Sequence, residues 1–356
     1  MAIDRSQKSI FRHLGRLIQY IDKRKVILKV LDQDAYRLSM PNTRFVGSYP
    51  LMALSDVRPD RPQSSFIDIE YLNDLPFQLS AMDPEKVASI YICSDALTLF
   101  STTVLPKLKR KFILVSGDSD FEICAEKLQG AFDLILENPN LIAWFAQNKS
   151  GSHPKLHSLP IGLDFHSKWI DPEMWGQGSM LPSMQELELR LIFSNSPRWE
   201  NRITKAYCDW THKIERGDRR ECKSKLDPNA CVFSINPLSR VDTWVEQSRY
   251  AFVVSPSGEG LDCHRTWEAL ALGCVPVIKN HSFADMFKDL PVLVINDWSE
   301  VTESFLQEWH GKFNTQEFNY SNLMLTQWRS KIQEPQINKQ ILSKMTMNEF
   351  RTFICA

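Results

Sequence analysis

Short apolar runs recur along the chain, and each ends in polar or turn residues. In the first half these runs are VASIYICS, KFILVSGDSD, AFDLILEN and KLHSLPIGLD, separated by lengths that suit helices or loops. In the second half we expect strands in LRLIFSNS, NACVFSI, YAFVVSPS, CVPVIK and LPVLVIND, with a helix through RWENRITKAYCDW. The runs of the second half are nearly continuous in apolar residues, as in parallel strands that are buried on both faces. The pattern predicts an α/β fold whose strand ends carry the functional residues.

The length and a change in composition indicate two domains. A chain of 356 residues is long for one domain and gives two domains enough volume for separate cores. Between His166 and Leu189 the sequence becomes rich in Pro, Gly, Ser and Met, which is typical of a linker. We therefore predict an N-terminal α/β domain over 1–170, a linker over 171–188, a C-terminal α/β domain over 189–312 and a mostly helical tail over 313–356 with Met324 and Trp328 as packing residues.

The N-terminal region carries one amphipathic segment. Residues 8–22 place Ile10, Leu14, Ile18 and Ile21 near helical spacing. Because basic residues surround this stripe and are not confined to one face, a surface helix packed on its domain is favoured over a helix lying on a membrane. The terminus lacks the features of a signal peptide, and no apolar run approaches the roughly 20 residues of a membrane span. We expect a cytoplasmic protein, with peripheral attachment to a membrane left open.

The charge balance does not indicate a nucleic-acid-binding protein. The 42 Lys and Arg residues are matched by 43 Asp and Glu residues, for a net charge of -1, so any anionic ligand must be bound locally. The eight cysteines include no C-x-x-C pair, which fits reduced thiols better than a zinc site or a disulfide scaffold. A Cys222–Cys231 disulfide is conceivable in an oxidising compartment. We expect neither a metal ion nor another cofactor.

Residues 252–278 read as one βαβ unit. FVVSP is a strand, and residues 256–260 form a turn that proline and glycine favour. Asp262 suits the N-cap of a helix that runs from Cys263 until Gly273 ends it. CVPVI then returns as a parallel strand. One stripe of the helix should face the sheet, formed by Cys263, Trp267, Leu270 and Cys274.

The neighbouring face of this helix carries His264, Arg265 and Glu268, just beyond the carboxyl end of a strand. Ligands of open α/β sheets bind in this position. A helix N-terminus preceded by glycines suits an anion, and the guanidinium of Arg265 can donate two parallel hydrogen bonds to a phosphate. Glu268, one turn deeper, is placed to accept hydrogen bonds from ribose hydroxyls. The alternative is a plain surface helix with a salt bridge between Arg265 and Glu268.

The segment SPSGEGLDCHRTWEALALGCVPVI fits no common nucleotide motif. Cys263 stands where the dinucleotide fingerprint G-x-G-x-x-G has its third glycine, and the chain has no G-x-x-x-x-G-K-[ST] loop. The segment does resemble the donor-binding part of exostosin-like GT-B glycosyltransferases, which has the general form FvisPsG.G.D..R.wEaLa.GcvPVi. Weaker similarity extends to ENPNLIAWFAQN, HPKLHSLPIGLD and LIFSNSPRWENR, whereas residues 1–85 show none.

The resemblance implies two Rossmann-type domains that face a central cleft, with the acceptor on the N-terminal domain and the nucleotide sugar on the C-terminal domain. It also implies that Glu268 binds the ribose. Many GT-B enzymes have two glutamates eight positions apart, whereas Glu259 and Glu268 are nine apart, so Glu259 is given no ribose role. Glu259 and His264 both lie where the sugar should be, and which of them touches it is open. The expected donor-binding residues are Ser194, Asn195, Arg198, Arg202, Ser255, Ser257, Gly258, Glu259, Gly260, His264, Arg265 and Glu268.

The resemblance favours an inverting transfer, which needs a general base close to the acceptor hydroxyl. Acidic residues and one histidine follow the predicted strands of the N-terminal domain. We favour Asp118 or Asp120, in ILVSGDSD, over Asp95, Asp164 and His166.

Together these features predict a metal-independent glycosyltransferase that moves a sugar from a nucleotide sugar, with a UDP-sugar in first place, to a carbohydrate or glycoconjugate acceptor. Three alternatives are open. Asp118 and Asp120 could be the D-x-D motif of a metal-dependent GT-A glycosyltransferase. The same scaffold could bind a nucleotide sugar or a glycan without catalysis. The unorthodox nucleotide turn could also belong to an oxidoreductase or a methyltransferase.

Overall fold

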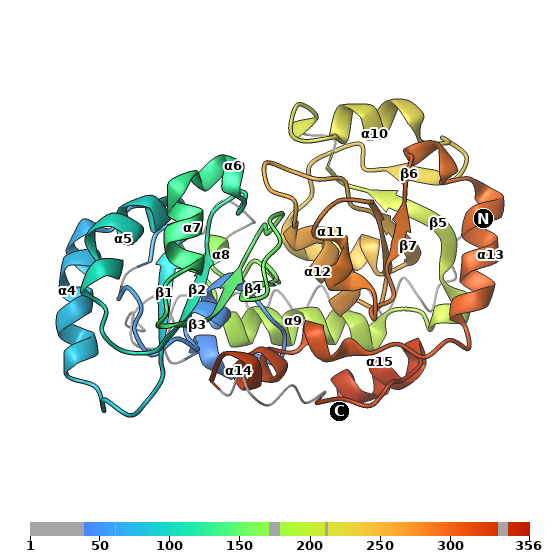
Figure 1. The fold of residues 1–356 in the computed structure, drawn as a ribbon. Coiled ribbons are helices and arrows are strands. Elements are labelled where there is room, and N and C mark those ends of the chain that lie inside the picture. Colours follow the sequence, from blue (N-terminus) through green and yellow to red (C-terminus); the bar gives the residue numbers. More distant parts are fainter. Residues whose placement is uncertain (1–38, 61, 171–178, 211–212, 334–340) are drawn as a thin grey trace.

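Two parallel β-sheets organise the chain, one in each of two lobes (Figure 1). The structure is a computed structural model, and it describes residues 39–60, 62–170, 179–210, 213–333 and 341–356. The expected surface helix over 8–22 lies outside the described residues, as does the 171–178 part of the expected linker. The prediction of a mixed α/β fold with parallel strands is confirmed.

The first lobe contains a four-stranded parallel sheet in the order β1-β2-β3-β4. Its strands are β1 (Ala88–Cys93), β2 (Phe112–Gly117), β3 (Leu141–Ala146) and β4 (Leu156–Ser158). The helices of this part of the chain are η1 (Met40–Asn42), α3 (Ser48–Met52), α4 (Ile69–Ser80), η2 (Ser94–Ala96), α5 (Leu97–Thr103), η3 (Leu105–Lys107), α6 (Ala125–Leu128), α7 (Gly130–Leu136) and α8 (Ser167–Ile170). Because strand residues alternate between faces, Ile90 joins the core formed with α4, α5 and α7, whereas Tyr91 joins the core formed with α3.

One predicted strand of the first lobe is a helix. AFDLILEN forms α7, and the third strand is LIAWFA, which is β3. Phe132, Ile135 and Leu136 are buried at helical spacing, while Leu134 is exposed. An apolar run of this length fits either element, and here the spacing of its buried residues favours the helix.

The second lobe contains a five-stranded parallel sheet in the order β6-β5-β7-β8-β9. Its strands are β5 (Ile203–Cys208), β6 (Cys231–Phe233), β7 (Tyr250–Val254), β8 (Val275–Lys279) and β9 (Leu293–Ile295). Its helices are η4 (Trp199–Asn201), α10 (Arg219–Lys225), α11 (Arg240–Gln247), α12 (His264–Ala271), η6 (Ala284–Phe287), η7 (Trp298–Glu300) and α13 (Glu303–Phe313). The strand order changes direction between β5 and β7, which is the position where open α/β sheets bind ligands.

The start of the second lobe differs from the prediction. LRLIFSNS is the end of helix α9 (Pro182–Asn195), so residues 182–188 of the expected linker are helical. Leu189, Ile192 and Phe193 are buried at helical spacing in this helix. RWENRITKAYCDW, expected as a helix, contains the first strand of the sheet, β5.

The βαβ unit over 252–278 is confirmed as β7, α12 and β8, with the two strands paired in parallel. The expected N-cap is wrong, because α12 begins at His264 with Cys263 as its N-cap. Asp262 is instead buried, and it accepts hydrogen bonds from the Ile161 backbone N–H and from the Trp267 indole. Gly273, which follows the helix, has a φ of +67°. Of the stripe expected to face the sheet, Trp267, Leu270 and Cys274 are fully buried.

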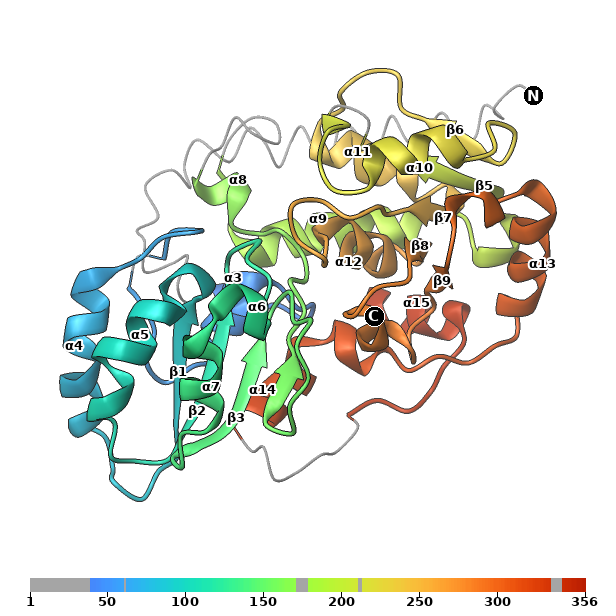
Figure 2. The ribbon, with the colours of Figure 1, turned by 45° about the horizontal axis from the view of Figure 1, so that its top comes forward.

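Part of the C-terminal chain returns to the first lobe, and the rest lies beneath the second lobe (Figures 1 and 2). Its helices are η8 (Tyr320–Leu323), α14 (Leu325–Gln333) and α15 (Met347–Cys355). Met324 pairs with Phe45 in an isolated β-bridge, α14 packs against α3, and α15 packs against α9. Met324 and Trp328 are buried, as predicted. Within the described residues, no helix combines the length and the apolar character that a membrane span requires.

All eight cysteines are free thiols. Cys222 and Cys231, for which a disulfide was conceivable, are both buried without being bridged.

Candidate functional site

A cavity of about 550 Å³ lies between the two lobes. Residues that follow strands of both sheets line it, including Asp118 and Asp120 after β2 and Asp209 after β5. The loop after β7 and the start of α12 complete the second-lobe wall. The carboxyl ends of two parallel sheets therefore face one cavity, which is where α/β folds bind their ligands.

The second-lobe wall carries a group of cationic side chains, which we call the cationic wall: Lys213, Arg216, Arg219 and Arg265. Arg265 Nε donates to Asp209 Oδ1 at 2.7 Å. Arg265 Nη1 and Arg219 Nε are buried, and neither has a hydrogen-bond partner among the described residues. Burial and the neighbouring charge of Arg265 lower the pKa of Arg219. Two partly desolvated guanidinium groups with donors to spare form a site for an anion with several oxygens.

Two loops must approach closely to build this wall. Gly217 has a φ of +51°, and a Cβ there would lie 2.5 Å from the backbone oxygen of Gly258. Asp218 fixes the same contact, because its Oδ1 accepts from both the backbone N–H and the hydroxyl of Ser257 at 2.8 Å. Because Gly217 has no Cβ, the loop after β5 can lie directly against the loop after β7.

Ser255 and Ser257, expected to bind the donor, brace the loop after β7. Ser255 Oγ lies 2.9 Å from Thr266 Oγ1, and Ser257 is bonded to Asp218. Both serines line a separate cavity of about 110 Å³ behind the loop. Gly258, Glu259 and Gly260 do line the main cavity.

Glu268 lines the main cavity, and it makes no salt bridge with Arg265. Its Oε1 lies 3.5 Å from Arg240 Nη2, and Arg265 pairs with Asp209. Burial raises the pKa of Glu268, while the charge of Arg240 opposes this shift. The carboxyl group is therefore available at the cavity as a hydrogen-bond acceptor.

The first-lobe wall carries Asp118 and Asp120, as predicted for residues at the end of β2. Asp118 is only 5% exposed and has a φ of +57°. Its backbone N–H donates to Gln147 Oε1, and its Oδ1 accepts from the Ser64 hydroxyl, both at 2.8 Å. Burial raises the pKa of Asp118, although the charge of His166 works against this, and partial desolvation also raises the pKa of the more exposed Asp120.

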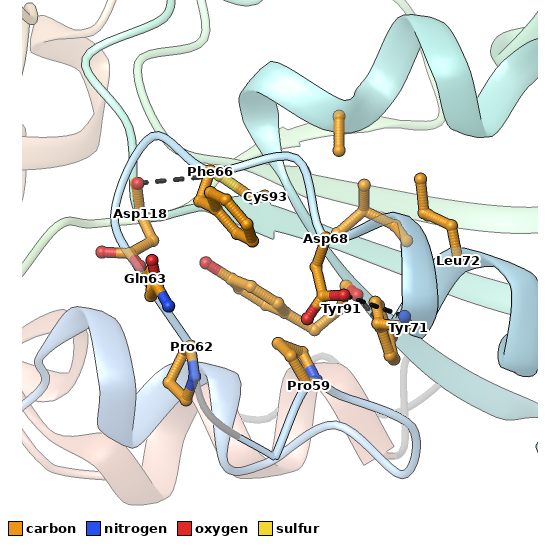
Figure 3. Close-up of a pocket in the computed structure, with 12 residues that line it drawn as sticks. Pro59, Pro62, Gln63, Phe66, Asp68, Tyr71, Leu72, Tyr91, Cys93 and Asp118 are labelled. Carbon is orange, nitrogen blue, oxygen red and sulfur yellow. Dashed lines mark hydrogen bonds between the residues drawn. The ribbon is translucent and has the colours of Figure 1, made fainter.

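A second, small cavity beside Asp118 explains part of this burial (Figure 3). Pro62, Phe66 and Tyr91 line it together with Asp118, under the loop that precedes α4. Apolar surface on this side limits the access of water to the carboxyl group, which disfavours its charged form.

Four expected donor-binding residues lie away from the cavity. Ser194 and Asn195 end α9 and donate to the Leu191 backbone oxygen. Arg198 is absent from the residues that line the cavity, and the buried Arg202 donates to the backbone oxygens of Tyr250 and Leu272. These residues precede β5 and so stand at the amino end of the sheet, opposite the cavity. The expectation failed because it rested on a strand at LRLIFSNS.

The residues after the actual first strand were missed by the sequence analysis. Lys213, Arg216 and Arg219 follow β5 within KIERGDRR. The cluster of basic residues that follows ITKAYC in the sequence could have indicated that this segment binds an anion. Nothing in the sequence indicated a role at the site for Arg240, on α11, because only the folded structure brings it close to Asp164 and Glu268.

No protein-family model matches the chain, and no curated protein sequence matches it either. The resemblance to exostosin-like GT-B glycosyltransferases therefore rests on the motif alone.

Proposed function

We propose that the protein is a GT-B-type glycosyltransferase that moves a sugar from a UDP-sugar to a carbohydrate or glycoconjugate acceptor, with inversion at the transferred carbon. One observation carries the proposal: the cationic wall of the second lobe and the buried Asp118 of the first lobe line a single cavity. An anion site and a carboxyl base on opposite walls are the two elements that such a transfer needs.

The donor is assigned to the second lobe. Arg219 and Arg265 bind the diphosphate through their guanidinium groups, and Lys213 and Arg216 add positive charge. Glu268 accepts hydrogen bonds from the ribose. As the sugar leaves, the growing charge on the diphosphate is stabilised by these side chains and by the N-terminus of α12, without a metal ion at the leaving group.

The acceptor is assigned to the first lobe. Its hydroxyl oxygen attacks the anomeric carbon from the side opposite the diphosphate, the bond to the diphosphate breaks, and the hydroxyl proton passes to Asp118. The raised pKa of Asp118 suits a group that must take up a proton during the reaction. Asp120 is the second candidate for this role.

A thermal-shift screen against UDP, GDP, CMP, NAD and S-adenosylmethionine, with and without EDTA, tests the proposal. We expect a nucleoside diphosphate to raise the melting temperature, and EDTA to leave that ligand-induced shift unchanged. A UDP-induced shift that EDTA removes would support the D-x-D alternative. Binding of NAD or S-adenosylmethionine with none of UDP or GDP would contradict the proposal. A protein that binds UDP but releases none from a UDP-sugar with any acceptor would be a binding protein on the same scaffold.

A further inference from the structure

Three side chains with metal-binding chemistry meet at the boundary between the two lobes. Asp164 and His166 lie after β4 in the first lobe, and His264 begins α12 in the second. Each offers one ligand atom, and the three atoms lie within 4.8 Å of one another. All three residues line the main cavity, but none belongs to the cationic wall or is the proposed base.

The His264 ring is oriented by the first lobe. Its Nδ1 lies 2.7 Å from the backbone oxygen of Gly162. A carbonyl oxygen can only accept, so Nδ1 carries the hydrogen, and Nε2 of the neutral ring keeps a free electron pair. Histidines that bind metal ions have this arrangement, because a carbonyl or a carboxylate fixes the other ring nitrogen.

The His166 ring is also held in place. It stacks on Tyr49 with ring centroids 4.5 Å apart and an angle of 13° between the planes. Its Nδ1 is buried and lies 3.3 Å from Asp164 Oδ1, but it is not aligned for a hydrogen bond with any described residue. A buried imidazole nitrogen without a hydrogen-bond partner lowers the stability of the folded state unless another group or ion binds it.

The Asp164 carboxylate is fixed from both sides. The Ser167 backbone N–H donates to its Oδ1 at 2.9 Å, and Arg240 Nη2 lies 3.3 Å from its Oδ2. Arg240 also donates to Gln185 Oε1 at 2.8 Å, and it shares its charge with Glu268. The Arg240 guanidinium therefore orients the Asp164 carboxylate, but its single positive charge does not neutralise both Asp164 and Glu268.

The surroundings favour a cation. The carboxyl groups of Asp118, Asp120, Asp262 and Glu268 line the same cavity as the three side chains. The same carboxyl groups would stabilise a metal ion bound by those side chains.

We propose that Asp164, His166 and His264 bind one divalent transition-metal ion of the zinc type, which joins the two lobes across the cleft. Two imidazoles and one carboxylate suit zinc, and a fourth position stays open to the cavity. Ligands that lie about 2 Å from a tetrahedral ion are roughly 3.3 Å apart, so the side chains must approach one another by up to about 1.5 Å on binding. The site is separate from the diphosphate site, and the inference does not depend on the proposed transfer reaction.

The test uses the full chain, stripped of metal by EDTA and dialysed, with Zn²⁺ alone as the probe. We expect one zinc ion to bind per chain and to raise the melting temperature. His264→Gln, which removes the ligand of the second lobe, should abolish this binding, and so should His166→Gln. His157→Gln is the matched control, because His157 is exposed on β4 and does not line the cavity.

Co²⁺ in place of Zn²⁺ identifies the ligand atoms. Nitrogen and oxygen ligands should give visible absorption bands without an intense sulfur-to-metal band, and His264→Gln should remove them. A strong sulfur band would place the ion on the cysteines and overturn the proposal. It would also be overturned if stripped protein bound no zinc, or if both histidine variants bound zinc like the wild type. The melting temperatures of the variants in EDTA show whether each one is folded, and UDP binding in EDTA reports the diphosphate site independently.

Discussion

Arg265 Nε donates to Asp209 Oδ1 at 2.7 Å, an ion pair that connects the start of α12 to the residue after β5. The pair spans the point where the strand order of the second sheet changes direction. Asp209 orients the guanidinium, while Arg265 Nη1 is left buried without a hydrogen-bond partner in the described part of the chain. The ion pair therefore fixes the orientation of the Arg265 side chain within the cationic wall.

Arg265→Gln should weaken UDP binding by about tenfold to a hundredfold, because a hydrogen bond to a charged group is worth about 1.5–3 kcal/mol. Arg265→Lys keeps the charge but loses the paired N–H donors of the guanidinium. Its affinity for UDP should therefore fall between those of the wild type and Arg265→Gln. Isothermal titration calorimetry measures both. Equal affinity of all three proteins for UDP would show that Arg265 does not bind the diphosphate.

Gly217→Ala should lower both stability and UDP affinity. The new Cβ would lie 2.5 Å from the Gly258 backbone oxygen at a positive φ, so the two loops of the cationic wall would have to separate. The strain costs about 1–2 kcal/mol before the clash is counted. Gly311→Ala is the control. A Cβ at Gly311, within α13, meets nothing within 4 Å, so this change should raise stability by about 0.5–1 kcal/mol. Denaturant unfolding of the two variants checks the contrast, and similar effects would contradict it.

Asp118→Asn should reduce sugar transfer by about 10²–10⁴-fold, because it removes the general base, while UDP binding stays unchanged. Burial raises the pKa of Asp118, and only the ionised carboxylate can accept the proton. The transfer rate of the wild type should therefore rise with pH until Asp118 is ionised, and the residual rate of Asp118→Asn should lack this rise. Rates of UDP release from a UDP-sugar in the presence of a carbohydrate acceptor, measured across pH, report both effects. A variant with the wild-type rate would move the role to Asp120.

Asp262 gives stability a dependence on pH. Burial raises the pKa of Asp262 to about 7, above the value near 3.8 of an ordinary aspartate. The folded state therefore holds the proton more tightly than the unfolded state, so stability is fully present below about pH 4 and is lost as pH rises through about 7.

Over that range we expect the wild type to lose about 2–4 kcal/mol relative to Asp262→Asn, which has no such proton. Urea unfolding at several pH values measures the difference between the two proteins. Asp285→Asn, at an exposed site, should show no such trend relative to the wild type. A difference between Asp262→Asn and the wild type that did not change with pH would refute this assignment.

The sequence was sufficient for the unit built from β7, α12 and β8. Neighbouring residues alone specify its apolar strands, the glycine turn and the glycine that ends the helix. The structure places His264, Arg265 and Glu268 at the cavity, as this unit predicts. Local patterns were not sufficient at LRLIFSNS, because a short apolar run fits a strand or a helix equally well. Only its contacts with α11, α12 and α15 decide that α9 is a helix.

The misplacement of Ser194, Asn195, Arg198 and Arg202 follows from that one ambiguity. With the first strand placed too early, these four residues were expected at the donor site, whereas Lys213, Arg216 and Arg219 follow the actual first strand, β5, and line the cavity. The cluster of Asp164, Arg240 and Glu268 was beyond prediction for another reason. Its members come from three separate segments, and no pattern in one sequence shows that they meet.

The central claim is that the cationic wall binds a nucleoside diphosphate without a metal ion, and neighbouring arginines test it most directly. Arg219 lines the cavity, whereas the adjacent Arg220 is exposed and pairs with Glu215. Calorimetry of UDP binding in EDTA should show binding by the wild type and by Arg220→Gln, with affinity reduced at least about tenfold in Arg219→Gln. Equal affinities for the two variants, or no binding of UDP or GDP by the wild type, would contradict the account.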